Sequence, residues 1–128
     1  MCVALWGGWA FFGKLALRHS SWAQVSFTYG LAVAVVSGAL FLGSSRRSFA
    51  GSGGWALGVG GLCGALGTVA FYLALERGKA SAVVPLVSVY PLITTALAVA
   101  FLSEAITALQ AIGVACALGG VVLIGLGR

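Results

Sequence analysis

Five continuous apolar runs, separated by polar links, make up almost the whole chain. A helix needs about 20 mostly apolar residues to cross the hydrocarbon of a bilayer, and each run has or approaches that length. The strict alternation of apolar and polar residues that marks a transmembrane barrel strand is missing. The pattern therefore predicts an all-α integral membrane protein with one domain over residues 1–128. We expect five transmembrane helices, at approximately residues 2–19, 22–43, 55–76, 81–102 and 108–126.

Two polar patterns indicate where helices begin. Ser21 stands three residues before Gln24, which is the spacing of a capping box. Thr107 and Gln110 repeat this spacing at the start of the last run. In each pair the hydroxyl and the amide would satisfy backbone N–H groups that lipid cannot bond. Glu104, shortly before the second pair, places a carboxylate near a helix N-terminus, where the helix dipole favours it.

Glycine is concentrated in two of the runs. Gly60 and Gly64 form a GxxxG pattern in the third run, and Gly113 and Gly120 lie in the fifth. Small residues at such spacing let helix backbones approach closely in a membrane. We expect these four glycines to serve helix packing.

The fourth run contains the residues that best suit a binding site. Pro91 lies near its middle, where it frees the carbonyl of Val87 and predicts a kink. Ser88, Pro91 and Thr95 share one face, and Tyr90 is adjacent. Freed carbonyls and hydroxyls at this depth predict a polar substrate cavity. The alternative is that the hydroxyls only bond their own helix or a neighbouring one.

Two residues of the first run are further cavity candidates. Lys14 is the only charged residue inside an apolar run. Either the long aliphatic part of the side chain lets the ammonium reach the membrane surface, or the ammonium lines the cavity. Trp6 is either an interfacial anchor or a cavity wall.

The amino-acid composition excludes two classes of protein. Hydrophobic residues make up 61% of the chain and charged residues 7%, against roughly 25% charged in a soluble domain. The mean hydropathy is +1.12. These values exclude a soluble globular domain and a disordered chain. The net charge of +5 comes from cations at the ends of apolar runs, so it indicates a lipid bilayer as partner, not nucleic acid.

The small number of titratable side chains argues against an enzyme. The chain has one histidine and two glutamates, and no carboxylate lies inside an apolar run. The chain therefore lacks the residues that general acid–base catalysis needs. The three cysteines form no CxxC motif, so we expect no catalytic residues, no metal site and no cofactor.

Cations give little information on membrane orientation. One side would collect Lys14, Arg18, Arg77, Lys79 and Arg128, and the other Arg46 and Arg47. Without Lys14, which lies in a run, and the last residue, Arg128, the count is three against two. A bias this small sets neither orientation.

Several short motifs occur in an order that resembles the EamA family of the drug/metabolite transporter superfamily. They are Leu5-Trp6-Gly7 with Lys14, the stretch from Phe71 to Ala80, Pro85, Pro91, Leu102-Ser103-Glu104 and Gln110-Ala111-Ile112-Gly113. The resemblance covers essentially the whole chain. It implies a transporter of small organic metabolites or drugs that works by alternating access. It also implies a multi-pass protein of the cell membrane, such as the inner membrane of a bacterium.

The departure from the family pattern is length. The usual member resembles two five-helix repeats, and these 128 residues contain one. A second copy fused in line would be inverted in the membrane, so this unit would be half of a ten-helix inverted-repeat transporter. We therefore expect a homodimer, with the antiparallel arrangement as one form, or a complex with a second five-helix chain. The alternative function is a non-transporting membrane subunit that supports a larger partner.

Overall fold

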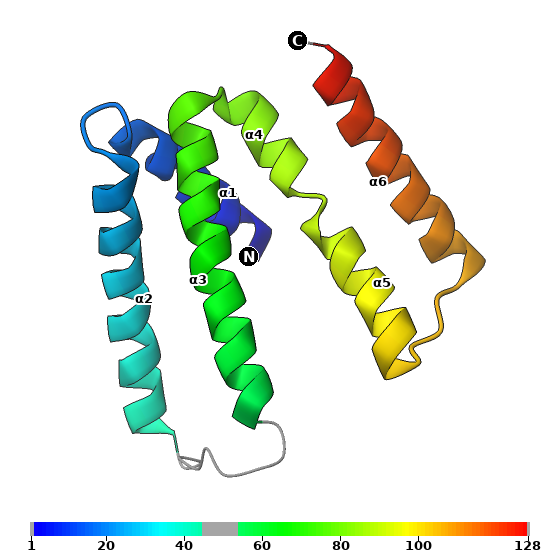
Figure 1. Cartoon of the computed structure of the whole chain (residues 1–128), viewed down its shortest axis with the longest axis horizontal. Helices are drawn as coiled ribbons and strands as arrows, with labels where there is room; N and C mark the ends of the chain where they lie inside the picture. Colours follow the sequence, from blue (N-terminus) through cyan, green and yellow to red (C-terminus); the bar gives the residue numbers. More distant parts are fainter. Residues whose placement is uncertain (1, 45–53, 128) are drawn as a thin grey trace. The chain divides into compact units, whose positions relative to one another are not determined.

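A computed structural model describes residues 2–44 and 54–127, and within them every regular element is a helix (Figure 1). The helices are α1 (Cys2–Ala16), α2 (Trp22–Gly43), α3 (Gly54–Arg77), α4 (Ala80–Val87), α5 (Tyr90–Leu102) and α6 (Ala108–Leu126). They form two compact units, Met1–Arg77 and Gly78–Arg128. Arg46, Arg47 and Arg128, which enter the charge count, lie outside the described residues.

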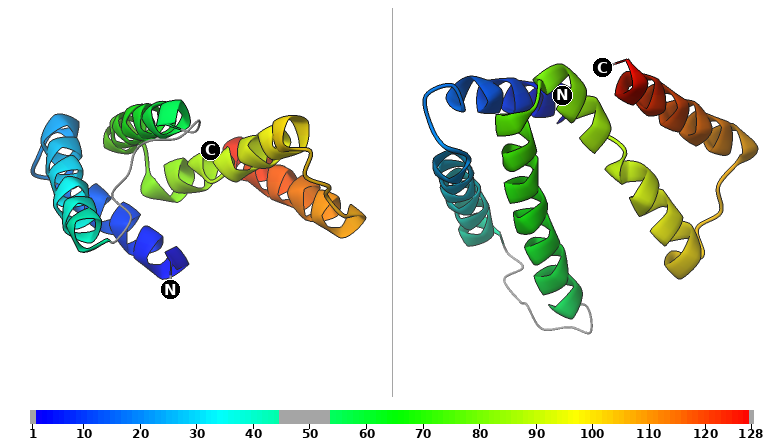
Figure 2. Two further views of the ribbon diagram at one scale, coloured as in Figure 1. Left: turned by 90° about the horizontal axis from the view of Figure 1, so that it is seen from below. Right: turned by 45° about the horizontal axis from the view of Figure 1, so that its top comes forward.

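The first unit consists of an antiparallel pair, α2 and α3, crossed by α1 (Figures 1 and 2). Its buried residues come from all three helices: Ala10, Val25, Phe71, Tyr72 and Leu75. Most of its other apolar side chains are exposed, as expected for helices that face lipid. The core of this unit is therefore small and lies where α1 meets the pair.

Aromatic rings fill that crossing point. Trp9 of α1 stacks on Phe71 at 4.8 Å between ring centroids, and it meets Tyr29 at 5.3 Å and Tyr72 at 5.7 Å. Such pairs contribute about 0.5–1.5 kcal/mol each beyond the area they bury. This ring cluster fixes α1 against both helices of the pair.

The second unit contains α4, α5 and α6, and α4 packs against α6. Val83 is its one buried hydrophobic residue within the part of the chain that the structure describes. The unit therefore has almost no core of its own.

The single helix predicted over 81–102 is wrong in one respect, because it is divided into α4 and α5. The break lies at Ser88 and Val89, ahead of Pro91, which stands in the first turn of α5. Pro91 has no N–H to bond the carbonyl of Val87, and its ring opposes a helical turn there, so the chain unwinds before it. Pro85 lies inside α4.

The first helix also differs from its expected range of 2–19. It ends at Ala16, and residues 17–19 form a turn in which Arg18 N–H bonds Leu15 O and His19 N–H bonds Ala16 O. Its 15 residues are about 22 Å long, below the roughly 30 Å of the hydrocarbon. Among the described residues, four segments are long and apolar enough to span a membrane: Trp22–Gly43, Gly54–Arg77, Ala80–Leu102 and Ala108–Leu126.

The helix starts at α2 and α6 carry complete capping boxes. The backbone N–H of Gln24 donates to Ser21 Oγ at 3.4 Å, and Ser21 N–H donates to Gln24 Oε1 at 2.9 Å. At α6, Gln110 N–H donates to Thr107 Oγ1 at 3.2 Å and Thr107 N–H to Gln110 Oε1 at 2.8 Å. Both helices therefore begin at a point set by local hydrogen bonds.

Gly13 provides a test of the ring cluster. A Cβ added at Gly13 would lie 2.9 Å from Cε1 of Tyr72, whose side chain is 1% exposed and cannot move aside. We predict that Gly13→Ala lowers the free energy of unfolding by about 1–3 kcal/mol, the usual cost of overpacking. Denaturation in detergent micelles, followed by tryptophan fluorescence, measures the change.

The matched control is Gly8→Ala in the same helix, where an added Cβ meets no atom within 4 Å. It should be neutral or gain up to about 1 kcal/mol from helix propensity. Equal stability of the two variants would contradict the packing of α1 on Tyr72.

Candidate functional site

An open groove of about 580 Å³ lies in the second unit between α5, the link that follows it and α6. Five residues singled out in the sequence line it, namely Pro91, Thr95, Glu104, Gln110 and Gly113. Thr94 adds a second hydroxyl, and Ala98, Val99 and Val114 contribute apolar wall. The groove thus combines apolar sides with a few polar groups, as small-molecule sites do.

The hydroxyls of this region bond their own helices. Ser88 Oγ donates to Val84 O at 2.9 Å, and Thr95 Oγ1 donates to Pro91 O at 2.9 Å. Thr94 Oγ1 does the same to Tyr90 O at 3.3 Å. A hydroxyl has one proton and two lone pairs, so each of these oxygens is left as an acceptor. The two threonines therefore offer a ligand acceptors rather than donors.

Glu104 and Gln110 complete the polar lining. Gln110 Oε1 accepts from the Thr107 N–H and lies 3.1 Å from Thr107 Oγ1, so the side-chain NH₂ of Gln110 is its remaining donor. The Glu104 carboxylate is exposed in the link between α5 and α6. The groove is consequently rich in acceptors and carries one negative charge.

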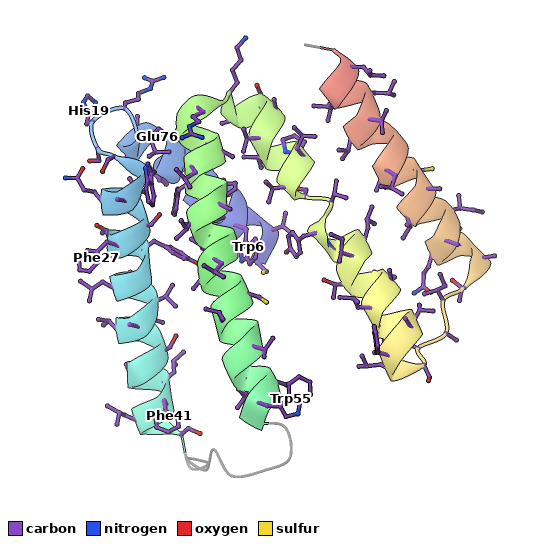
Figure 3. All side chains as sticks on the ribbon, in the orientation of Figure 1. Trp6, His19, Phe27, Phe41, Trp55 and Glu76 are labelled. Carbon is purple, nitrogen blue, oxygen red and sulfur yellow. The ribbon has the colours of Figure 1, made fainter. Side chains whose placement is uncertain are left out.

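The other predicted cavity residues are not among those that line this groove. Ser88 and Tyr90, at the break, are exposed and are not part of the groove lining. Trp6 belongs to the first unit, where its ring lies 6.0 Å from that of Trp9 (Figure 3). The helical face expected to join Ser88 with Pro91 and Thr95 is interrupted, because α4 ends at Val87.

Lys14 has a structural contact at the end of α3. Its Nζ donates to the carbonyl of Leu75 at 2.6 Å. Leu75 is two residues from the helix end, so its carbonyl is one of the last four, which have no partner inside the helix. A cation there also suits the negative end of the helix dipole. The bond places the ammonium at the C-terminal end of α3.

Glu76 makes the complementary contact one residue later. Its Oε1 accepts the backbone N–H of Trp22, the first residue of α2, at 3.1 Å. The end of α3 therefore accepts two hydrogen bonds, one from a side chain of α1 and one from the backbone of α2. Sequence reasoning missed this pair of contacts and also the roles of Tyr29, Phe71 and Tyr72, since nothing local marks which distant residues meet.

The four packing glycines face open space. A Cβ added at Gly60, Gly64, Gly113 or Gly120 would meet no atom within 4 Å. In residues 2–44 and 54–127, no three His, Cys, Asp or Glu side chains gather in a way that could hold a metal ion.

Replacing Lys14 tests its contact with α3. Lys14→Leu removes the donor to the buried Leu75, and hydrogen bonds to charged groups contribute about 1.5–3 kcal/mol. We predict a loss of that size in the free energy of unfolding, measured in detergent by circular dichroism. Lys79→Leu removes an equal charge from an exposed position without a side-chain capping bond, and should change stability by less than about 0.5 kcal/mol. Equal losses in both variants would argue against the contact.

Comparison with known proteins identifies the family to which the chain belongs. A segment of 59 residues is 46% identical to an uncharacterized protein of Methanocaldococcus jannaschii. This segment is 46% of the chain and 43% of that relative, so the match spans less than half of either, and the two chains are similar in length. No solved structure matches the chain. The EamA-like transporter family matches residues 1–126, and the chain therefore belongs to this family of multi-pass membrane proteins.

Proposed function

We propose that the protein moves small organic metabolites or drugs across the cell membrane, for a bacterium its inner membrane, by alternating access. Membership of a transporter family supports the class of activity. The observation that carries the proposal is the α5–α6 groove, because it places acceptor groups of a broken helix where a solute could bind. Discontinuous helices of this kind commonly form the substrate sites of secondary transporters.

The chemistry of the groove favours a solute that donates hydrogen bonds. Thr94 and Thr95 have already used their protons on the carbonyls of their own helix. Glu104 adds an anionic acceptor at the link between α5 and α6. We therefore favour an amine- or hydroxyl-bearing molecule over an anion, which would meet repulsion from the carboxylate.

The break between α4 and α5 would provide the movement. It divides the 23-residue span Ala80–Leu102 into segments of 8 and 13 residues. Ser88 and Val89 carry the conformational change there, because Pro91 prevents a continuous helix. Movement of α5 about this point would open or close the groove that it lines.

Uptake by reconstituted vesicles tests the proposal. A panel of labelled amines, amino acids and polyols is screened first, and the best solute is used for variants. Thr95→Val should lower its initial uptake rate about 3–10-fold, which corresponds to one lost hydrogen bond of about 0.5–1.5 kcal/mol.

The matched control is Thr68→Val in α3. Its Oγ1 donates to Gly64 O at 2.8 Å, so it has the same kind of bond within its helix, but it does not line the groove. Equal effects of the two substitutions would show that only helix stability was altered. Absence of uptake for every solute, in folded protein, would favour the non-transporting subunit.

Assembly is the second part of the proposal. The whole chain is one half of a ten-helix inverted-repeat transporter, with α1 counted as its fifth membrane helix. The partner is a second copy, in antiparallel orientation, or another five-helix chain. The open faces at Gly60, Gly64, Gly113 and Gly120 support this, because they leave room for a neighbouring helix. The second unit, with Val83 as its one described buried hydrophobic residue, also needs apolar neighbours.

Biasing the orientation tests the antiparallel dimer. Two lysines added within residues 45–53 should drive the chain to one orientation, as cytoplasmic loops favour Lys and Arg. Uptake should then fall to background and should return when a copy biased the opposite way is co-expressed. Full uptake from a single fixed orientation would exclude the antiparallel homodimer.

A further inference from the structure

A second groove, of about 320 Å³, lies in the first unit between α1 and α2. Its walls include Trp9, Phe12 and Ala16 of α1 and Gln24, Thr28 and Ala32 of α2. Phe12, Thr28 and Ala32 are exposed, so the groove is open along its length. Its volume is at the lower end of the range for ligand pockets, about 300–1,000 Å³.

The groove is polar at one end and mostly apolar along the rest. Ser20, in the turn between α1 and α2, and Gln24 line the polar end. Ala32, about two helical turns after Gln24 in α2, marks the other end. The indole of Trp9 adds an apolar ring to its wall. An occupant with a polar head and an apolar tail matches this distribution.

A cationic side chain lies next to the polar end. Arg18 and His19 are exposed in the turn that precedes Ser20. Figure 3 shows His19 and Glu76 at the same end of this unit, and Arg77 follows Glu76 as the last residue of α3. Glu76 is the carboxylate found there among the described residues, and it already accepts the N–H of Trp22. An anionic head group is therefore electrostatically favoured at this end.

We propose that this groove binds an anionic phospholipid. One acyl chain lies between α1 and α2, and the phosphate contacts Arg18 beside Ser20. The surrounding medium supplies the occupant, because an apolar groove open along a membrane helix fills with lipid chains rather than with water. The basic turn selects among lipids by charge. No part of this proposal depends on transport.

Lipid titration of the purified chain, followed by native mass spectrometry, tests the site. Phosphatidylglycerol and phosphatidylcholine with identical acyl chains serve as probes. We expect phosphatidylglycerol to bind at least fivefold more tightly. Arg18→Gln should reduce this preference about fivefold, the effect of one basic residue near an anionic surface, and Arg18→Lys should retain it.

Two matched substitutions in α2 locate the acyl chain. Ala32→Phe places a ring in the groove, whereas Ala34→Phe places the same ring at an exposed position outside its lining. We expect Ala32→Phe alone to weaken both lipids about tenfold. Equal affinity for the two lipids in the unmodified chain would overturn the role of the basic turn. Equal binding by the two phenylalanine variants would overturn the groove as the site.

Discussion

Helix ends that lie close to lipid must have their backbone groups satisfied by the protein itself, and the fold depends on how this chain does so. With 7% charged residues, it has few side chains for the task. Ser21 and Thr107 cap the starts of two helices, Lys14 bonds the end of α3, and Glu76 receives a free N–H of α2. These same contacts decide where helices begin and hold α1 and α2 to α3. Polar residues thus organise a structure that is otherwise almost entirely apolar.

The two units differ in how their helices are stabilised. The first has the ring cluster around Trp9 and a buried Leu75. The second has a broken helix and little buried apolar surface. The first unit is therefore the better packed of the two, and the second is expected to have the lower local stability. The proposed solute groove lies in the loosely packed unit, and the proposed lipid groove in the other.

Sequence patterns predicted those features that depend on neighbouring residues. Capping residues within three positions of one another gave the starts of α2 and α6, and the family was evident from motif order. Contacts between distant residues could not be predicted in this way. Lys14 and Leu75 are 61 positions apart, and Trp22 and Glu76 are 54 apart, so only the packed helices bring them together. The predicted kink takes the form of a break directly after Val87, the residue whose carbonyl Pro91 leaves without a helical partner.

Glycine gives α3 an unusual surface. Gly58, Gly60, Gly61, Gly64 and Gly67 have no neighbour within 4 Å of an added Cβ. Without side chains the helix is narrow along this face, and its Cα–H groups are accessible to the carbonyls of an approaching backbone. Such contacts are weak, about 0.5–1 kcal/mol each, and form without rotamer ordering. Two helices joined in this way can separate and rejoin without leaving a strong donor or acceptor unpaired in lipid.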